Sequence, residues 1–161
     1  MLDHVVQKGA KDCVIATAAW VANVDYDVAA ARSPVPVGTR GLRYWETRRL
    51  LESLTGLRWR VSRKLFRSVS RLPFTDRPSV IIAGQPWHWR MHCLGLEGQR
   101  VYDSAFPHAF RRSEYPLKHW RVLFVFRPFI PEQLDEHRRI NLWARFRAGL
   151  LSDLEHAYKR P

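Results

Sequence analysis

The stretch HWRMHCLGLEGQRVYD, residues 88–103, has the pattern of two β-strands joined by a short turn. Its two arms are rich in aromatic and aliphatic residues that alternate with polar ones, as is typical of half-buried strands. The segment GLEGQ at 95–99 carries two glycines, which suit a tight turn between the arms. We therefore predict a β-hairpin in which residues 88–94 pair with residues 99–103.

Further strands are predicted on both sides of this hairpin. The apolar, strand-like segments are LRWRV (57–61), SVIIAG (79–84) and HWRVLFVF (119–126). Together with the hairpin they make up an antiparallel sheet in the second half of the chain.

The first third of the chain has helical patterns instead. Asp12 precedes the apolar run from Cys13 to about Ala22, and its carboxylate is expected to cap a helix there. The segment DYDVAAARS (25–33) predicts a short second helix, and Thr39 is expected to cap a third that ends at Gly56. Helices followed by an antiparallel sheet predict the α+β class, with N-terminal helices packed on the sheet.

The domain organisation follows from length and pattern. A chain of 161 residues suits one domain with its own core, and we assign residues 1–130 to it. Residues 131–161 are predicted to form a basic amphipathic C-terminal helix, with apolar residues at helical spacing.

The bulk composition limits the classes of partner. The net charge of +12 favours anionic partners such as nucleic acid, a membrane surface or an acidic protein. No apolar run is long enough to span a membrane, and no secretory signal is recognised, so we expect a cytoplasmic protein. The two cysteines, Cys13 and Cys93, are expected to be thiols in a reducing compartment.

Cys13 is a candidate nucleophile because it begins a predicted helix. The unpaired N–H groups and the dipole of a helix N-terminus favour a thiolate. The structural alternative is a small buried hydrophobic residue, since free cysteines are commonly buried.

A base and an orienting group for such a nucleophile are expected in the hairpin. His88 opens the first arm and Asp103 ends the second, so antiparallel pairing is expected to bring the two side chains together. The structural alternative is a pair of exposed residues at strand ends.

The sequence disfavours two other chemistries, metal binding and nucleic-acid binding. His88, His92 and Cys93 have a spacing that suits zinc on a helix, but on a strand the two histidines lie roughly 13 Å apart. We therefore expect no metal and no cofactor. The clusters LRWRV, WHWR and KHWRV combine aromatic and basic residues, but no nucleic-acid-binding motif contains them, so nucleic-acid binding is expected to be secondary.

Four features in order resemble the bacteriocin-processing branch of the papain-like cysteine peptidases, enzymes that remove double-glycine leader peptides. They are Gln7 six residues before Cys13, the segment GTRGLRYWETRRLLESLTG (38–56), the histidine-bearing strand from residue 88, and the return to Asp103. The resemblance covers roughly residues 5 to 126. It implies a papain-like fold for the domain of residues 1–130.

The resemblance also implies a role for each residue. Cys13 would be the nucleophile, His88 the general base and acid, and Asp103 the group that orients the imidazole. The Gln7 side chain and the Cys13 backbone N–H would form the oxyanion hole. The chain departs from the family at Val14, where glycine is usual, and at Ser104, where proline is usual.

From these features we expect a standalone cysteine peptidase that cleaves a peptide or isopeptide amide bond through a thiolate acyl-enzyme. Its substrate would be a peptide or protein, and the basic charge favours an acidic one. The alternative from another class is a basic binding module on the same fold that binds nucleic acid or an acidic protein without catalysis. A third alternative keeps the chemistry but changes the bond, as in cleavage of peptidoglycan amides or of ubiquitin-like isopeptide bonds.

Overall fold

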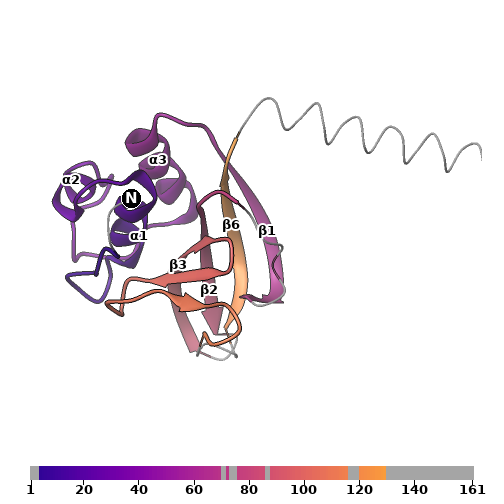
Figure 1. Cartoon of the computed structure of the whole chain (residues 1–161). Coiled ribbons are helices and arrows are strands. Elements are labelled where there is room, and N and C mark those ends of the chain that lie inside the picture. Colours follow the sequence, from indigo (N-terminus) through magenta and orange to yellow (C-terminus); the bar gives the residue numbers. More distant parts are fainter. Residues whose placement is uncertain (1–3, 70–71, 73–75, 86–87, 116–119, 130–161) are drawn as a thin grey trace, which may run out of the picture. The chain divides into compact units, whose positions relative to one another are not determined.

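A computed structural model gives the fold of the chain (Figure 1). It describes residues 4–69, 72, 76–85, 88–115 and 120–129, with the side chains of residues 64–67 and 88–90 also outside the description. The predicted C-terminal helix of residues 131–161 lies outside the described residues.

Three helices come first in the described chain, as the sequence predicts. They are α1 (Cys13–Ala22), α2 (Tyr26–Ala31) and α3 (Tyr44–Thr55). The first two end where the apolar runs end. The third ends at Gly56, whose φ of 67° is a left-handed conformation that glycine adopts without strain.

The strands that follow form one antiparallel sheet. They are β1 (Trp59–Ser68), β2 (Ser79–Gln85), β3 (His88–Glu97), β4 (Arg100–Asp103), β5 (Phe110–Arg111) and β6 (Arg121–Pro128). Their order across the sheet is β1-β6-β2-β3-β4-β5, and every neighbouring pair is antiparallel. The predicted α+β class is confirmed. A hairpin of β3 and β4 is present, but it pairs residues 94–97 with residues 100–103 and not the predicted residues 88–94 with 99–103. The two-residue strand β5 was not predicted.

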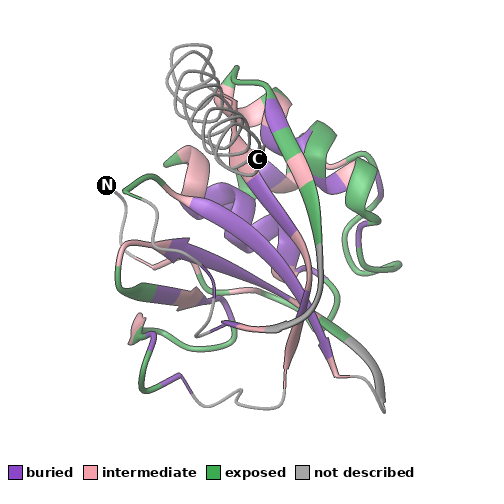
Figure 2. Cartoon of the chain, turned by 90° about the vertical axis from the view of Figure 1, so that its right-hand side faces the viewer, coloured by how far each residue is buried: buried purple, intermediate pink, exposed green. Residues whose placement is uncertain are grey.

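The sheet has a core on each face. On one face, buried residues of the three helices pack against Val80, Ile82, Cys93 and Phe126 of the central strands (Figure 1). The other face carries Ile81, Leu94, Leu96, Val101, Val122 and Val125, which pack with residues of the loops around Val69 and Tyr115. Figure 2 shows that the buried residues gather where the helices and the sheet meet. This burial on both faces explains the nearly continuous apolar run in β2.

The predicted cap of α1 is corrected by the structure. The helix begins at Cys13, but the Asp12 carboxylate makes no capping hydrogen bond to it. Instead both carboxylate oxygens of Asp12 accept the Gly9 N–H at 3.0 Å, and one accepts the Tyr26 hydroxyl. Asp12 therefore ties the preceding loop to α2, and this fixes where the chain enters α1.

The start of α3 is also corrected. The sequence placed a cap at Thr39, but the helix begins at Tyr44, and the Thr39 hydroxyl donates to the Pro36 carbonyl at 2.8 Å. The Glu46 carboxylate accepts the Arg43 backbone N–H at 2.8 Å and so supplies the cap. Residues 40–43 lie outside the helix, and the Arg43 backbone is extended.

Gly95 lies in β3 directly under the indole of Trp20 from α1. A Cβ atom at this position would lie 2.3 Å from Trp20 Cζ3 and 2.6 Å from Cε3. Trp20 is buried and stacks on Tyr102 with ring centroids 3.9 Å apart, so it has no room to move away. Only glycine allows α1 to approach the sheet this closely.

We expect Gly95→Ala to reduce the free energy of unfolding by about 1–3 kcal/mol, because overpacking forces α1 away from β3. Urea denaturation followed by tryptophan fluorescence would measure the loss. Gly41→Ala is the matched control, since the nearest atom to an added Cβ there is the Lys11 carbonyl oxygen at 4.0 Å. Equal stability of the two variants would contradict the packing argument.

Among the described residues, no helix has both the length and the apolar character needed to cross a membrane.

Candidate active site

Cys13 is the first residue of α1, at the edge of the helical layer that faces β3. It is half-buried and not in a disulfide. One turn further along, the Thr17 hydroxyl donates to the Cys13 carbonyl at 2.8 Å and lies 3.4 Å from the Cys93 carbonyl. Thr17 therefore fixes the first turn of α1 against β3, and with it the position of the Cys13 thiol.

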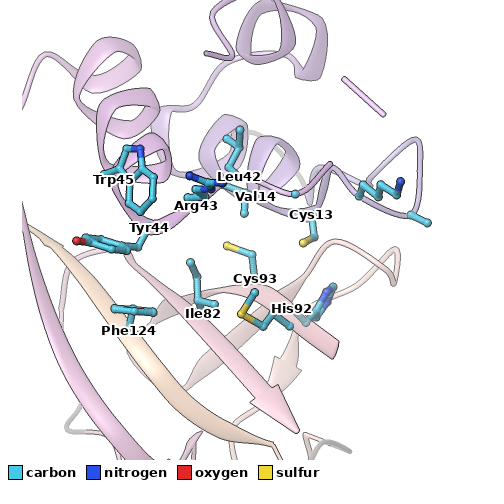
Figure 3. Close-up of a pocket in the computed structure, with 14 residues that line it drawn as sticks. Cys13, Val14, Leu42, Arg43, Tyr44, Trp45, Ile82, His92, Cys93 and Phe124 are labelled. Carbon is cyan, nitrogen blue, oxygen red and sulfur yellow. The ribbon is translucent and has the colours of Figure 1, made fainter. Parts of the chain in front are cut away.

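An imidazole and a carboxylate meet beside this thiol, and the imidazole belongs to His92. Its Nε2 atom lies 2.5 Å from Oδ1 of Asp103, and Cys13 lies close enough to the ring to help raise the pKa of His92. Figure 3 shows the His92 ring below the Cys13 sulfur. With Nε2 on the carboxylate, Nδ1 is the ring nitrogen left for the thiol. Cys13, His92 and Asp103 thus form a continuous line of contacts.

The expected contact between His88 and Asp103 is corrected by the register of the hairpin. Asp103 pairs with Leu94, two residues beyond His92, whereas His88 pairs with Gln85 on β2. His88 lies six positions before Leu94 on β3, which is roughly 20 Å at about 3.3 Å per residue. The side chain of His88 lies outside the described part of the structure.

The position of the turn explains this correction. The sequence offered two glycines, Gly95 and Gly98, for the reversal of the chain. The chain turns at Gly98, whose φ is 53°, while Gly95 stays in β3 under Trp20. With Glu97 paired to Arg100, the register places Leu94 opposite Asp103. The histidine nearest to Leu94 on β3 is His92, two residues before it, and this is the histidine that meets Asp103.

Asp103 is buried, and its carboxylate is fully occupied. Besides His92, its Oδ1 atom accepts the Ala105 N–H at 2.9 Å, and Oδ2 accepts the Tyr115 hydroxyl at 2.7 Å. Burial tends to raise the pKa of Asp103, but these hydrogen bonds, that of His92 foremost, hold the pKa below its ordinary value. Asp103 is therefore a fixed negative charge behind the imidazole. Nothing in the sequence pattern indicated Tyr115.

The protonated form of His92 is strongly favoured. Burial tends to lower the pKa of His92, but hydrogen bonds to Asp103 and Cys13 outweigh it and raise the pKa to about 9 from an ordinary 6.5. The imidazolium therefore persists through neutral pH. A protonated imidazole beside the Cys13 thiol can provide a proton for a leaving group.

Gln7 lies in the loop before α1 and is held to the segment after β4. Its backbone N–H donates to the Ser104 carbonyl at 2.9 Å, and its side-chain Oε1 accepts the Ser104 hydroxyl at 3.1 Å. The imidazole of His4 bonds to the Asp103 carbonyl at 2.7 Å and fixes the same loop. With Oε1 engaged, the Gln7 amide nitrogen remains a donor for another acceptor.

The second cysteine differs from the first. Cys93 follows His92 on β3 and is 1% exposed, within the core between sheet and helices. Burial, with the nearby Cys13 as a smaller cause, raises the pKa of the Cys93 thiol well above its ordinary value. Cys93 is therefore a structural thiol, and both cysteines are free, as expected.

A cavity of about 450 Å³ opens beside Cys13, between the helical layer and the sheet (Figure 3). Cys13 and His92 lie at one end, Cys93 lies further in, and the other end is formed by the start of α3 and by Phe124 of β6. Val14, which stands where the resembled family has glycine, is part of its wall. The arrangement is a half-buried thiol, a charged imidazole and a cavity in contact with both.

Metal binding has no support in the described part of the chain, where no group of three or more His, Cys, Asp or Glu residues is placed to hold an ion.

Comparison with protein-family models found no match, and comparison with curated proteins found none either.

Proposed function

We propose that this protein is a papain-like cysteine peptidase, with Cys13 as nucleophile, His92 as general acid and base, and Asp103 as the group that orients the imidazole. The observation that carries the proposal is the contact of one imidazole with both a thiol at a helix start and a buried carboxylate. Nucleophile, base and orienting group in this order are what acyl transfer by a thiol requires.

The first half of the reaction is acylation. The Cys13 thiolate attacks the carbonyl carbon of the peptide bond, and the electron pair of the carbonyl moves to its oxygen. As that pair returns, the C–N bond breaks, and the His92 imidazolium gives its proton to the leaving amine. A thioester on Cys13 and a free amine are the products of this half.

Deacylation restores the enzyme. Neutral His92 takes a proton from water, the resulting hydroxide attacks the thioester carbonyl, and the Cys13 thiolate leaves with its electron pair. The proton remains on His92, so the pair of Cys13 thiolate and His92 imidazolium is regenerated. Throughout, the bond from Asp103 keeps the ring in one orientation and stabilises its positive charge.

The negative charge on the carbonyl oxygen needs donors during both halves. The Cys13 N–H at the N-terminus of α1 is one, since the first N–H groups of a helix have no partner within it. The Gln7 amide, held by Ser104, is the second. Preorganised donors of this kind contribute about 10²–10³ in rate.

The sharpest test of the nucleophile is alkylation by iodoacetamide near neutral pH. We expect Cys13 to be alkylated at least ten times faster than Cys93, because Cys13 is half-buried beside an imidazolium and Cys93 is enclosed by the core. Mass spectrometry of tryptic peptides over time gives both rates, with Cys13→Ala and Cys93→Ala as matched controls. Faster reaction at Cys93 would contradict the assignment.

The alternative of a basic binding module is decided by the Cys13→Ala variant. A binding module retains its biological activity in this variant and loses it when exposed arginines of α3 and β1 are neutralised. A peptidase behaves in the opposite way. Retained activity of Cys13→Ala would therefore overturn the peptidase proposal whatever the fold.

A further inference from the structure

The cavity beside Cys13 has an apolar interior and a basic mouth. Val14, Leu42 and Ile82 are largely buried in its wall, while Tyr44 and Trp45 are about two-fifths exposed at its opening. Cys13 lines the same cavity as this apolar surface (Figure 3). An interior of this kind binds an apolar side chain better than a small or charged one.

The volume points to a large side chain. A cavity of about 450 Å³ has far more room than a glycine or alanine residue fills. Glycine at the corresponding positions, which the resemblance to double-glycine leader peptidases would favour, leaves this apolar surface in contact with water. A leucine, methionine or aromatic residue covers it.

Charge provides a second, independent constraint. The cavity is lined by two exposed cations, Lys11 and Arg43, and the described residues that line it include no Asp or Glu. The nearest carboxylate on α3, that of Glu46, is held by both terminal nitrogens of Arg40 at 2.8 and 2.6 Å. The Arg43 guanidinium instead lies over the Trp45 ring, 5.1 Å from its centroid, and the Lys11 ammonium bonds to the Thr39 carbonyl.

We propose that this cavity is the specificity site for the substrate, and that it binds a large apolar side chain with an acidic residue next to it in the peptide. The apolar side chain enters the cavity within one or two residues of the bond attacked by Cys13, since the thiol is part of the cavity wall. The neighbouring Asp or Glu pairs with Arg43 or Lys11 at the mouth. This inference rests on the proposed peptidase function.

The first experiment profiles cleavage by the full chain. We expect mass spectrometry of a digested peptide library to show Leu, Met, Phe or Trp close to the cut bond and Asp or Glu beside it. On matched synthetic substrates, replacing the apolar residue by alanine is expected to lower kcat/KM by about 10- to 100-fold. Replacing the acid by its amide is expected to cost about 2- to 5-fold, and the difference should shrink with added salt.

Arg43→Glu tests the charge directly. This variant is expected to reverse the preference, so that Lys or Arg replaces Asp or Glu beside the apolar residue. Arg49→Glu is the matched control, because Arg49 is an exposed arginine of the same helix that does not line the cavity. A cleavage profile that is the same in both variants, or one without an apolar preference in the wild type, overturns this inference and leaves the peptidase proposal intact.

A binding measurement decides the inference even if no peptide is cleaved. Cys13→Ala protein is titrated with three acetylated, amidated peptides: Gly-Glu-Phe-Glu-Gly, Gly-Gln-Phe-Gln-Gly and Gly-Glu-Ala-Glu-Gly. The indole N–H signal of Trp45, assigned with Trp45→Phe, reports occupancy of the cavity. We expect the first peptide to bind most tightly. Equal binding of all three, or no shift of this signal with any, overturns the inference, whereas failure of the peptidase proposal alone leaves the ranking in place.

Discussion

Replacing His92 by glutamine is expected to lower kcat for peptide cleavage by about 10²–10⁴-fold, the contribution typical of a general acid–base group. Glutamine keeps a hydrogen-bonding side chain towards Asp103 and Cys13, but it cannot carry a proton from the thiol to the leaving amine. The loss should therefore appear in kcat, with KM nearly unchanged. Steady-state kinetics on a fluorogenic peptide would measure both.

His88→Gln is the matched control, since it makes the same change four residues earlier on β3. We expect its kcat to remain within a few-fold of the wild type. Thermal unfolding of both variants separates loss of fold from loss of chemistry. If His88→Gln is the inactive variant and His92→Gln is active, the assignment of the base to His92 is wrong.

The pH dependence of the wild type gives a second readout of the same residue. His92 has a pKa of about 9 in the folded protein, above its ordinary value of 6.5, so its proton is retained through neutral pH and lost as pH rises through about 9. Because acylation needs that proton, kcat/KM should fall on the alkaline side near pH 9. The protonated ring also contributes to the free energy of unfolding. This contribution is fully present below about pH 6.5 and is lost as the pH rises through about 9.

The sequence predicts the secondary structure of the site well where one segment decides it alone. The apolar run from Cys13 to Ala22 predicts the bounds of α1, and the glycine-bearing segment predicts the hairpin. Both depend on local chemistry: helix-compatible apolar residues in the first case, and a left-handed φ at Gly98 in the second. Structure formed within one continuous segment can therefore be predicted from the residues of that segment.

The register of the hairpin is less local, and it decides that His92 and not the predicted His88 meets Asp103. The chain turns at Gly98, while Gly95 stays in β3 beneath Trp20 of α1, a residue distant in sequence. A shift of the turn by a few residues changes which histidine meets Asp103. No pattern within residues 88–103 contains that information.

Contacts between residues far apart in the sequence cannot be predicted from local patterns, for the same reason. Tyr115 reaches Asp103 from a loop beyond β5, and Ser104 reaches Gln7 across 97 positions of the chain. Asp12 precedes an apolar run as a capping residue does, yet its carboxylate bonds to Gly9 and Tyr26. In each case a tertiary contact decides where the side chain goes, and local propensity does not.

Gln7 is the residue for which we expect the second large effect. Gln7→Ala should lower kcat by about 10²–10³-fold, because one donor to the carbonyl oxygen is lost when negative charge develops there. Alkylation of Cys13 by iodoacetamide forms no such oxygen anion, so its rate should be unchanged. A variant that also loses the alkylation rate has a disturbed site, and the assignment of Gln7 to the oxyanion hole is then wrong.

The Ser104 hydroxyl tests how Gln7 is held. Ser104→Ala removes the 3.1 Å bond to Gln7 Oε1 but keeps the backbone bond that docks the loop, so we expect kcat to fall by about 2- to 10-fold, the effect of one neutral hydrogen bond. In the Gln7→Ala background the same change should have no further effect, because Ser104 acts only through the Gln7 amide. Ser113→Ala, at an exposed serine, is the control. Additive losses in the double variant would show that Ser104 acts by another route, since two residues that act through one donor cannot lose it twice.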